Sequence, residues 1–178
     1  VVHYRNMRVK ELPATPLEPG QVAIANRGYR CLYTGVDFSG WRASEGWRSQ
    51  NWQFRFDGKP DAADKSLQTA ESFGDFGFIL DVRVSEDTKP CAVQLRGSAA
   101  GAVAIAPSLY KDALVFKGRN WNRFAGELRG DRLSLSLNGK PVFKNKKLGG
   151  VPAKGPLKIV PRGPINFANI YVRDLAKR

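Results

Sequence analysis

The stretch that decides the fold runs from Glu127 to Phe143 and reads ELRGDRLSLSLNGKPVF. Its central part, RLSLSL, alternates leucine with polar residues, which is the period of a β-strand with one buried face. Gly130-Asp131 precedes this run and Asn138-Gly139 follows it, and pairs of this kind form the tight turns of β-hairpins. We therefore predict two consecutive hairpins. The leucines expected to point inward are Leu133, Leu135 and Leu137.

The same alternation recurs along most of the chain, for example in FGFILDVRV at 76–84 and FANIYVRDL at 167–175. Helical spacing is confined to a turn around 61–70. About a dozen short strands must then cover one another, which two stacked antiparallel sheets achieve. We predict an all-β fold, a two-sheet antiparallel sandwich of the jelly-roll type. In the strand at 76–84, the side chains expected on one face are Phe78, Leu80 and Val82.

The composition fits one globular unit with a sizeable core: 178 residues, 42% of them apolar, and no apolar run near ~18 residues. We therefore expect no transmembrane segment. Lys and Arg number 29 against 16 Asp and Glu, and the net charge of +13 favours an anionic partner such as acidic polysaccharide, cell envelope or nucleic acid. A solvated basic surface is the alternative. Because no basic run exceeds KNKK at 144–147 and no nucleic-acid-binding motif occurs, nucleic acid is the weakest of these partners.

The two cysteines, Cys31 and Cys91, are too few for a disulfide scaffold, and each lies in an apolar alternating run. We expect buried thiols, with a single disulfide as the alternative. No phosphate-binding glycine loop, zinc-ligand spacing or nucleophile elbow occurs in the sequence. Calcium held by loop carboxylates would suit such a fold, but no clustered Asp/Asn run requires it. We therefore predict no cofactor and no metal site.

The chain begins with a segment that resembles its own end. YRNMRVKEL at 4–12 aligns with FANIYVRDL at 167–175, with Asn, Val and Leu at matching positions. The stretch PATPLEPG at 13–20 has linker composition. We interpret residues 1–12 as the closing strand of a preceding copy or an N-terminal extension, 13–20 as a Pro-rich linker, and 21–178 as the jelly-roll domain. A preceding domain in the same chain is then a partner, and chance similarity of two strands is the alternative.

Four segments, in order, resemble the DUF1080 or 3-keto-disaccharide hydrolase family. They are GYRCLYTGVDFSGW at 28–41, FGDFGFILDVRV at 73–84, NWNRFAGELRGDRLSLSLNGKPV at 120–142 and INFANIYVRDL at 165–175. The resemblance implies a concanavalin/laminin-G-like jelly roll and carbohydrate chemistry. It also implies a secreted, periplasmic or cell-envelope protein, of the kind described as glycosyl hydrolases. Residues 2–12 resemble the closing strand of that family.

The polar cleft of that family is altered here. Arg96 is kept in VQLRG, but Pro90, Cys91 and Ala92 replace the usual Asn-Ser-Gly. By the resemblance, a Glu and a Gln would stand where this chain has Ala102 and Ala104. A Gln and a His would stand where it has Val160 and Arg162. We therefore expect a filled or apolar cleft, with Arg96 either paired to a carboxylate or turned to solvent.

Glycoside hydrolysis needs a proton donor and a group that activates water or the sugar, commonly carboxylates or histidine. The only histidine is His3. Asp37, Asp57 and Asp81 are further carboxylates, and the first two lie in turn contexts that Asx capping explains. The candidates for catalysis are Arg96, Asp75 and Glu127.

Sugar binding needs flat apolar faces beside hydrogen-bonding groups. Trp47 lies among polar residues in RASEGWRSQN, so we expect an exposed loop residue there, flanked by two arginines, with a simple cap on the edge of the sandwich as the alternative. For Trp41, Trp52 and Trp121, which lie in fold motifs or on strands, core packing is the favoured interpretation. The candidates for ligand binding are Trp47, Arg42, Arg48, Tyr110 and Trp121.

Two functions follow from these observations. The first is a non-catalytic glycan-binding or scaffold module on a sugar-hydrolase fold. The second is an active glycosidase with a rearranged site. The lost polar positions of the cleft favour the first, and a purely structural spacer is a third outcome.

Overall fold

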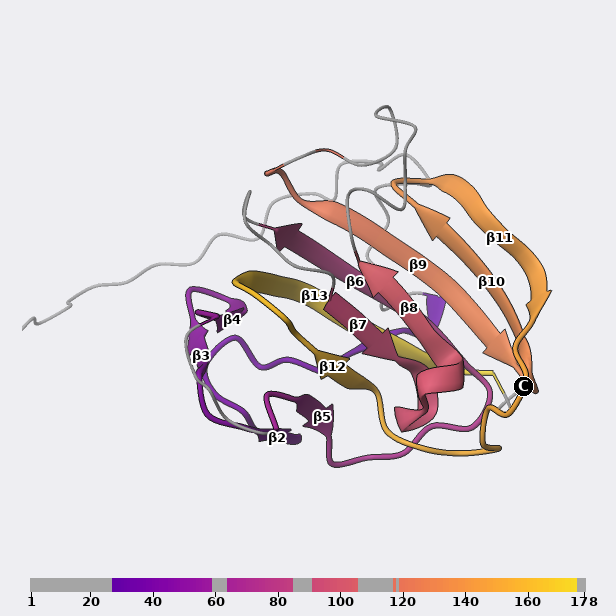
Figure 1. Cartoon of the computed structure of the whole chain (residues 1–178), viewed down its shortest axis with the longest axis horizontal. Coiled ribbons are helices and arrows are strands. Elements are labelled where there is room, and N and C mark those ends of the chain that lie inside the picture. Colours follow the sequence, from indigo (N-terminus) through magenta and orange to yellow (C-terminus); the bar gives the residue numbers. More distant parts are fainter. Residues whose placement is uncertain (1–26, 59–63, 85–90, 106–116, 118, 176–178) are drawn as a thin grey trace, which may run out of the picture.

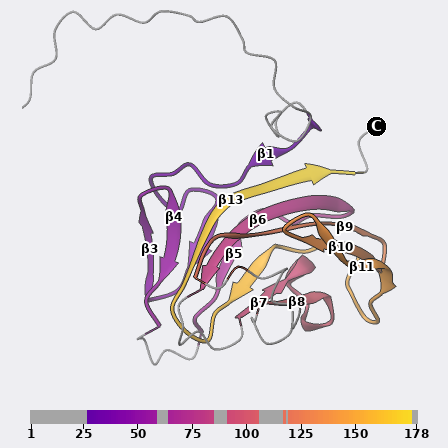
Figure 2. The same cartoon turned by 90° about the horizontal axis from the view of Figure 1, so that it is seen from above.

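The computed structural model of the chain describes residues 27–58, 64–84, 91–105, 117 and 119–175. These residues form a sandwich of two antiparallel sheets, which Figure 1 shows face-on and Figure 2 shows from above as two layers. The predicted all-β jelly roll is therefore confirmed. The proposed boundaries at 1–12 and 13–20 lie outside the described residues.

The larger sheet has the strand order β11-β10-β9-β6-β13-β4-β3, and β1 pairs with β13 beside this path. In that order the strands span Lys140–Lys147, Arg132–Leu137, Asn122–Arg129, Phe76–Val84, Ile165–Asp174, Gln53–Phe56 and Trp47–Gln50, and β1 spans Arg30–Cys31. The smaller sheet has the order β2-β5-β12-β7-β8. Its strands span Trp41–Ala43, Leu67–Thr69, Lys158–Val160, Cys91–Gln94 and Ala102–Ile105, and two 3-10 turns cover Leu95–Gly97 and Ala99–Gly101.

Both predicted hairpins are present. β9 and β10 pair as far as Arg129 and Arg132, around Gly130. β10 and β11 pair as far as Leu137 and Lys140, and the two turn residues between them both have positive φ, 50° and 82°. Positive φ at both positions defines the type I′ turn, whose twist matches the twist of the strands.

The core lies between the two sheets and is rich in phenylalanine and leucine. The three leucines of β10 are buried, and their neighbours face outward. The alternation that predicted inward side chains on β6 is confirmed too, since Phe78, Leu80 and Val82 are buried. The largest fully buried side chains include Phe54, Phe56, Phe76, Phe78, Phe124 and Phe167.

The helical turn predicted around 61–70 is not found where the structure describes it. Residues 67–69 form strand β5 instead, because they pair with β2 and β12. Cys91 is buried as expected, and burial raises the pKa of its thiol. Cys31 is exposed, contrary to expectation: it lies on the two-residue strand β1, which pairs only with β13 beside the main strand order of the larger sheet, and the two cysteines form no disulfide. None of the helices in the described ranges is long and apolar enough to span a membrane.

Candidate functional site

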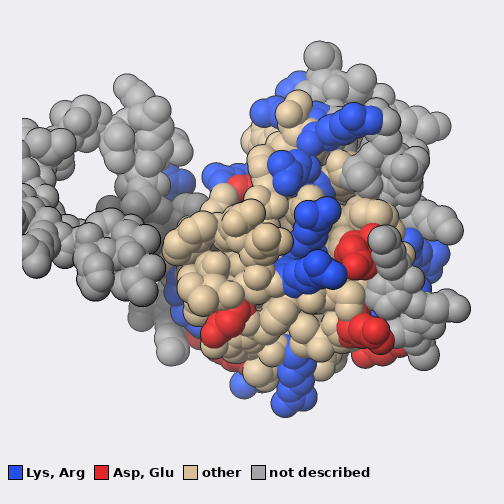
Figure 3. Space-filling model, turned by 90° about the vertical axis from the view of Figure 1, so that its left-hand side faces the viewer, with Lys and Arg blue, Asp and Glu red and all other residues tan. Residues whose placement is uncertain are grey.

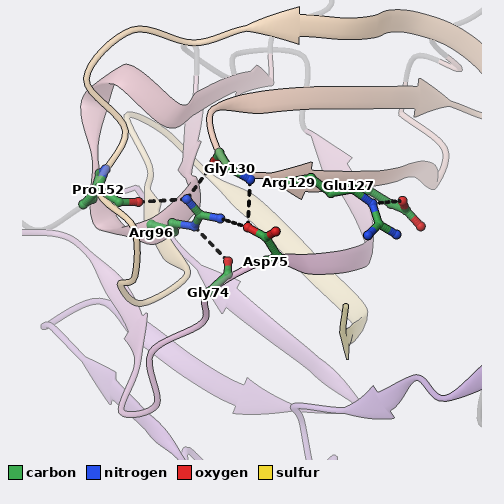
Figure 4. Close-up of polar contacts among 7 residues, drawn as sticks. All are labelled: Gly74, Asp75, Arg96, Glu127, Arg129, Gly130 and Pro152. Atoms are coloured by element: carbon green, nitrogen blue, oxygen red, sulfur yellow. Dashed lines mark hydrogen bonds and ion pairs between the residues drawn. The ribbon is translucent and has the colours of Figure 1, made fainter. Parts of the chain in front are cut away.

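Arg96, the arginine predicted for catalysis, is buried where three loops meet (Figure 4). Its side chain is 1% exposed, and its Nη2 donates to Asp75 Oδ1 at 2.8 Å. Nε donates to the carbonyl oxygen of Gly74 at 2.8 Å, and Nη1 to those of Gly130 and Pro152 at 2.8 and 2.9 Å. The expected pairing with a carboxylate is confirmed. With four of its five N–H donors used by the protein, this guanidinium links loops and has little left to offer a substrate.

The two predicted catalytic carboxylates are also engaged, and they lie apart. Asp75 Oδ1 accepts a second hydrogen bond from the backbone N–H of Gly130, at 2.8 Å. Glu127 accepts from Arg173 Nη2 at 2.6 Å and from Arg129 Nε at 3.2 Å. Figure 4 shows the Glu127–Arg129 pair on β9, separate from the cluster around Arg96. The structure therefore brings Asp75 to Arg96 but leaves Glu127 outside that group.

Three of the positions at which we predicted an altered cleft lie on the outer face of the smaller sheet. Ala92, Ala104 and Val160 form one row there, and this row is apolar as predicted. The adjacent row is not: Arg42, Gln68, Lys158, Gln94 and Ala102 lie in register across five strands. The predicted filled or apolar cleft is therefore only partly present. Gln94 and Lys158, each two residues along the strand from Ala92 and Val160, bring an amide and a cation to this face, and Arg42 and Gln68 of β2 and β5 add to them. Pro90 lies outside the described residues.

Trp47 was predicted to be an exposed loop residue, and this was wrong. It begins β3, opposite Phe56, and is only 7% exposed. Its ring packs at 5.3 Å from that of Phe56 and 6.3 Å from that of Phe167, and its Nε1 donates to the carbonyl of Lys65 at 2.9 Å. Of the polar neighbours that suggested a loop, Ser44 and Glu45 lie in the turn between β2 and β3, and Arg48 and Gln50 are outward-facing residues of β3.

Trp52, assigned to the core, is the exposed tryptophan. Its exposed fraction is 70%, because it stands in the two-residue turn of the β3–β4 hairpin, where Gln50 pairs with Gln53. Asn51 and Trp52 have φ values of 52° and 61°, again a type I′ turn. The indole lies against Gly35, where a Cβ would collide with the ring. Trp41 is buried, as expected.

A small cavity lies beside this hairpin on the outer face of the larger sheet. Its volume is about 220 Å³. Four amide side chains and two guanidiniums line it, and no carboxylate does. The lining residues are Gln50, Asn51, Gln53, Arg55, Arg83 and Asn166.

Strand register explains why these side chains converge. Arg48 of β3 pairs with Arg55 of β4, Arg55 with Asn166 of β13, and Asn166 with Arg83 of β6. Residues directly opposite each other in adjacent strands share a face, so these four form one row, which we call the arginine row. Its members come from segments far apart in the sequence. Arg48 was a predicted ligand residue, whereas Arg42 lies on the other sheet.

Arg83 is held in place within the row. Its guanidinium lies 4.8 Å from the ring centroid of Trp121, and its Nη2 donates to Gln53 Oε1 at 3.2 Å. A cation over an indole face is an attractive arrangement. Trp121, a predicted ligand residue, therefore borders the site and orients one of its cations. Tyr110, the other aromatic candidate, lies outside the described residues.

Several polar groups of the site are free to bind. Within the described ranges, the side-chain amides of Gln50, Asn51 and Asn166 have no hydrogen-bond partner, and Arg48 and Arg55 form no ion pair. Figure 3 shows the side of the molecule on which β3 and β4 lie. Lys and Arg side chains form a band across this face, and acidic side chains lie beside it.

Two larger cavities, of about 470 and 360 Å³, lie beside β1. They share Arg30, Glu71 and Phe73, and Arg30 forms an ion pair with Glu71. Asp75 lines the second cavity but is bonded to Arg96. Polar groups here bond mainly to one another, so the smaller cavity is the better candidate. No three His, Cys, Asp or Glu side chains of the described residues gather where they could hold a metal ion.

Comparison with protein-family models and with curated proteins found no match for this chain, so membership of the DUF1080 family stays a prediction. Solved structures do match. A candidate glycosyl hydrolase from Parabacteroides distasonis has a TM-score of 0.68 at 15% identity, covering 90% of this chain and 98% of that one. A second candidate glycosyl hydrolase from the same organism has a TM-score of 0.64 at 16% sequence identity, covering 83% of this chain and 99% of that one.

The carbohydrate-binding module CBM66 from Bacillus subtilis is also similar, with a TM-score of 0.55 at 17% identity, covering 78% of this chain and 98% of that one. At such identities the likeness establishes a shared fold. The chain is thus a jelly roll of the kind seen in glycosyl-hydrolase-like proteins and in a carbohydrate-binding module.

Proposed function

We propose that this domain is a non-catalytic glycan-binding module, and that the sugar binds in the cavity beside the β3–β4 hairpin. One observation carries the proposal: four amides, three of them without a hydrogen-bond partner among the described residues, and two guanidiniums line a cavity beside the hairpin turn that carries the exposed Trp52. Sugar hydroxyls both donate and accept, so amides, which do the same, suit them. The C–H face of a sugar ring is apolar and stacks on an indole such as Trp52.

The size of the cavity limits what enters it. At about 220 Å³ it is smaller than the roughly 300–1,000 Å³ of typical small-molecule sites. One sugar unit would occupy the cavity while its neighbour lies over Trp52. Because few sugar units contact the domain directly, we expect modest affinity at each site. Attachment of several domains along one polymer would raise the overall affinity.

Catalysis has weaker support. Asp75, Asp81 and Glu127 each accept a hydrogen bond from a guanidinium, so none is placed as a free proton donor. A glycosidase requires such a donor, together with a second carboxylate about 5–10 Å away. The alternative, a hydrolase with a rearranged site, is tested by the same experiment as the proposal.

Two further considerations support the proposal. The fold is shared with a carbohydrate-binding module and with candidate glycosyl hydrolases. Polysaccharide is met mainly outside the cytoplasm, so the proposal includes a secreted, periplasmic or cell-envelope location. It also includes a role beside a catalytic domain of the same chain.

The test is binding of the wild-type domain and two variants to immobilised polysaccharides. Trp52→Ala removes the stacking face and should weaken binding about tenfold or more, whereas Trp52→Phe keeps a flat ring and should retain most of it. Sugar release from the same polysaccharides is measured in parallel. Product release by the wild-type domain would favour the hydrolase, and binding that Trp52→Ala leaves unchanged would contradict the proposed site. Absence of both binding and turnover would leave a structural spacer.

A further inference from the structure

The arginine row of Arg48, Arg55, Asn166 and Arg83 points to the chemical class of the ligand. We infer that the site selects an anionic glycan, in which a sugar unit carries a carboxylate or a sulfate group. This inference rests on the proposed glycan-binding function and adds the charge of the ligand to it.

The arginine row is long enough to contact more than one sugar unit. Its four residues sit on four adjacent strands, β3, β4, β13 and β6. Adjacent strands are about 4.8 Å apart, so the row spans roughly 15 Å. That length holds more than one sugar unit, and cations lie at both ends and beside the cavity. A glycan with a regularly repeated negative charge fits such a row.

Two cations of the row, Arg48 and Arg55, repel each other. Arg48 and Arg55 face each other directly across an antiparallel pair, and like charges in that position destabilise a sheet. Neither forms an ion pair within the described part of the chain, and both are exposed. A local arrangement that works against stability, without compensation nearby, is typical of functional sites. A bound anion would relieve the repulsion.

The guanidinium of Arg83 is already held in position. Arg83 is fixed by the Trp121 ring at 4.8 Å and by Gln53 at 3.2 Å, so its planar fork needs little reordering to meet a ligand. A guanidinium fork matches two oxygens of a carboxylate or sulfate, which a lysine ammonium does not. The cavity that Arg83 lines also contains no carboxylate to compete for it.

A sugar fits the site better than a nucleic acid. Single-stranded nucleic acid is held by successive aromatic platforms on which bases stack. Among the described residues, the large apolar side chains that stand exposed are Trp52 and Val36, so one aromatic platform is offered. Amides in a small cavity suit hydroxyl groups, and single-stranded DNA is therefore included only as a comparison ligand.

The test uses matched pairs of polymers. Polygalacturonate and its methyl ester differ in carboxylate charge, and dextran sulfate and dextran differ in sulfate. We expect the wild-type chain to bind at least one anionic member about tenfold or more tightly than its neutral counterpart. The pair that shows the difference tells whether the carboxylate or the sulfate is recognised.

Substitutions in the arginine row test which residues recognise the negative charge of the polymer. Arg55→Gln and Arg83→Gln should each weaken binding of the anionic member about tenfold more than binding of its neutral counterpart. Arg83→Lys keeps the charge but loses the fork, and should weaken binding nearly as much as Arg83→Gln. Lys140→Gln is the control, because it removes the same charge from an exposed position at the far edge of the larger sheet.

Four results would overturn the inference. Equal binding of neutral and anionic members, still reduced by Trp52→Ala, would keep the proposed function and reject anion selectivity. Equal loss with Lys140→Gln, or DNA bound as tightly as the best anionic glycan, would show attraction by net charge alone. Binding of none of the polymers would instead reject the proposed function itself, and with it the inference.

Discussion

At the scale of single residues, the buried guanidinium of Arg96 links three loops. These are the loop before β6, the turn between β9 and β10, and the loop before β12. Burying a charge is costly unless its donors are satisfied, and here carbonyl oxygens and Asp75 satisfy them. These contacts give Arg96 a structural role in holding the three loops together.

Arg96→Met should lower the free energy of unfolding by about 2–3 kcal/mol, because it removes the cation paired with Asp75 and leaves three carbonyl oxygens without this donor. Denaturant titration measures this. Arg129→Gln is a suitable control, since that exposed side chain has one ion pair and should cost about 1 kcal/mol or less. A loss below about 1 kcal/mol for Arg96→Met would contradict the structural role.

The two tryptophans near the β3–β4 hairpin should behave in opposite ways. Trp47→Ala should cost about 3–5 kcal/mol of stability, because it empties a core position. Trp52→Ala should change stability by about 1 kcal/mol or less, since the indole is largely exposed. Thermal unfolding of both variants checks this. Equal stability losses would mean that the indole of Trp52 is part of the core.

Both errors of sequence interpretation at these tryptophans have one physical cause. Polar neighbours surround Trp47 because alternate residues of β3 face outward, so local polarity does not reveal the burial of the residue itself. Trp52 resembles the first residue of an alternating run, yet it belongs to the turn. Which residue begins a strand depends on pairing with β4, a tertiary fact that a short window of sequence does not contain.

At the scale of elements, β13 carries a bulge that completes a hydrogen-bond network around the buried carboxylate of Asp81. The register with β6 shifts between Ala168 and Tyr171, and Asn169 there has φ 49°. Its Nδ2 donates to Asp81 Oδ2 at 2.7 Å, and Arg123 donates to both oxygens of Asp81 at 2.7 and 2.8 Å. The hydrogen bonds from Arg123 to Asp81 raise the pKa of that arginine. The bulge thereby satisfies a carboxylate buried on the larger sheet.

Two variants separate the roles of Asn169. Asn169→Ala loses the hydrogen bond to Asp81 and strains a left-handed backbone, and should cost about 2–3 kcal/mol. Asn169→Gly loses the bond but tolerates the backbone, and should cost about 1 kcal/mol less. Denaturant unfolding gives both values. Equal costs would mean that backbone strain at the bulge is negligible.

The elements themselves were predictable because their signals are local. Leucine alternation in β10 and the Asn138-Gly139 turn identify their hairpin without reference to the rest of the chain. The arginine row was not predictable, because Arg48, Arg55 and Arg83 meet through pairings of β3, β4, β13 and β6. Sequence composition indicated an anionic partner through the net charge of +13, but it did not say where the cations gather.

At the scale of the whole molecule, binding should depend on salt and little on the protonation of the protein. Amides and guanidiniums line the cavity, and these groups do not titrate between about pH 4 and 10. Hydrogen bonds from the Ser66 side chain and backbone lower the pKa of Asp64, so its small contribution to stability is fully present above the ordinary carboxylate pKa and is lost as the pH falls through the lowered pKa.

Affinity for a carboxylated glycan should stay constant from about pH 8 to pH 5 and fall only as the carboxylates of the ligand protonate near pH 4. Affinity for a sulfated glycan should stay constant through that range. Isothermal titration at several pH values measures both. A transition near pH 6–7 would require a titrating protein group at the site and would contradict the described lining.

The central claim is that glycan binds at the cavity beside Trp52, and amide-detected NMR titration tests it most directly. On addition of the best-bound oligosaccharide, the side-chain NH₂ signals of Gln50, Asn51 and Asn166 and the indole N–H of Trp52 should shift with one common dissociation constant. Signals near Arg96 should stay in place. Shifts confined to the loops around Asp75 and Arg96, or to the outer face of the smaller sheet, would contradict the claim.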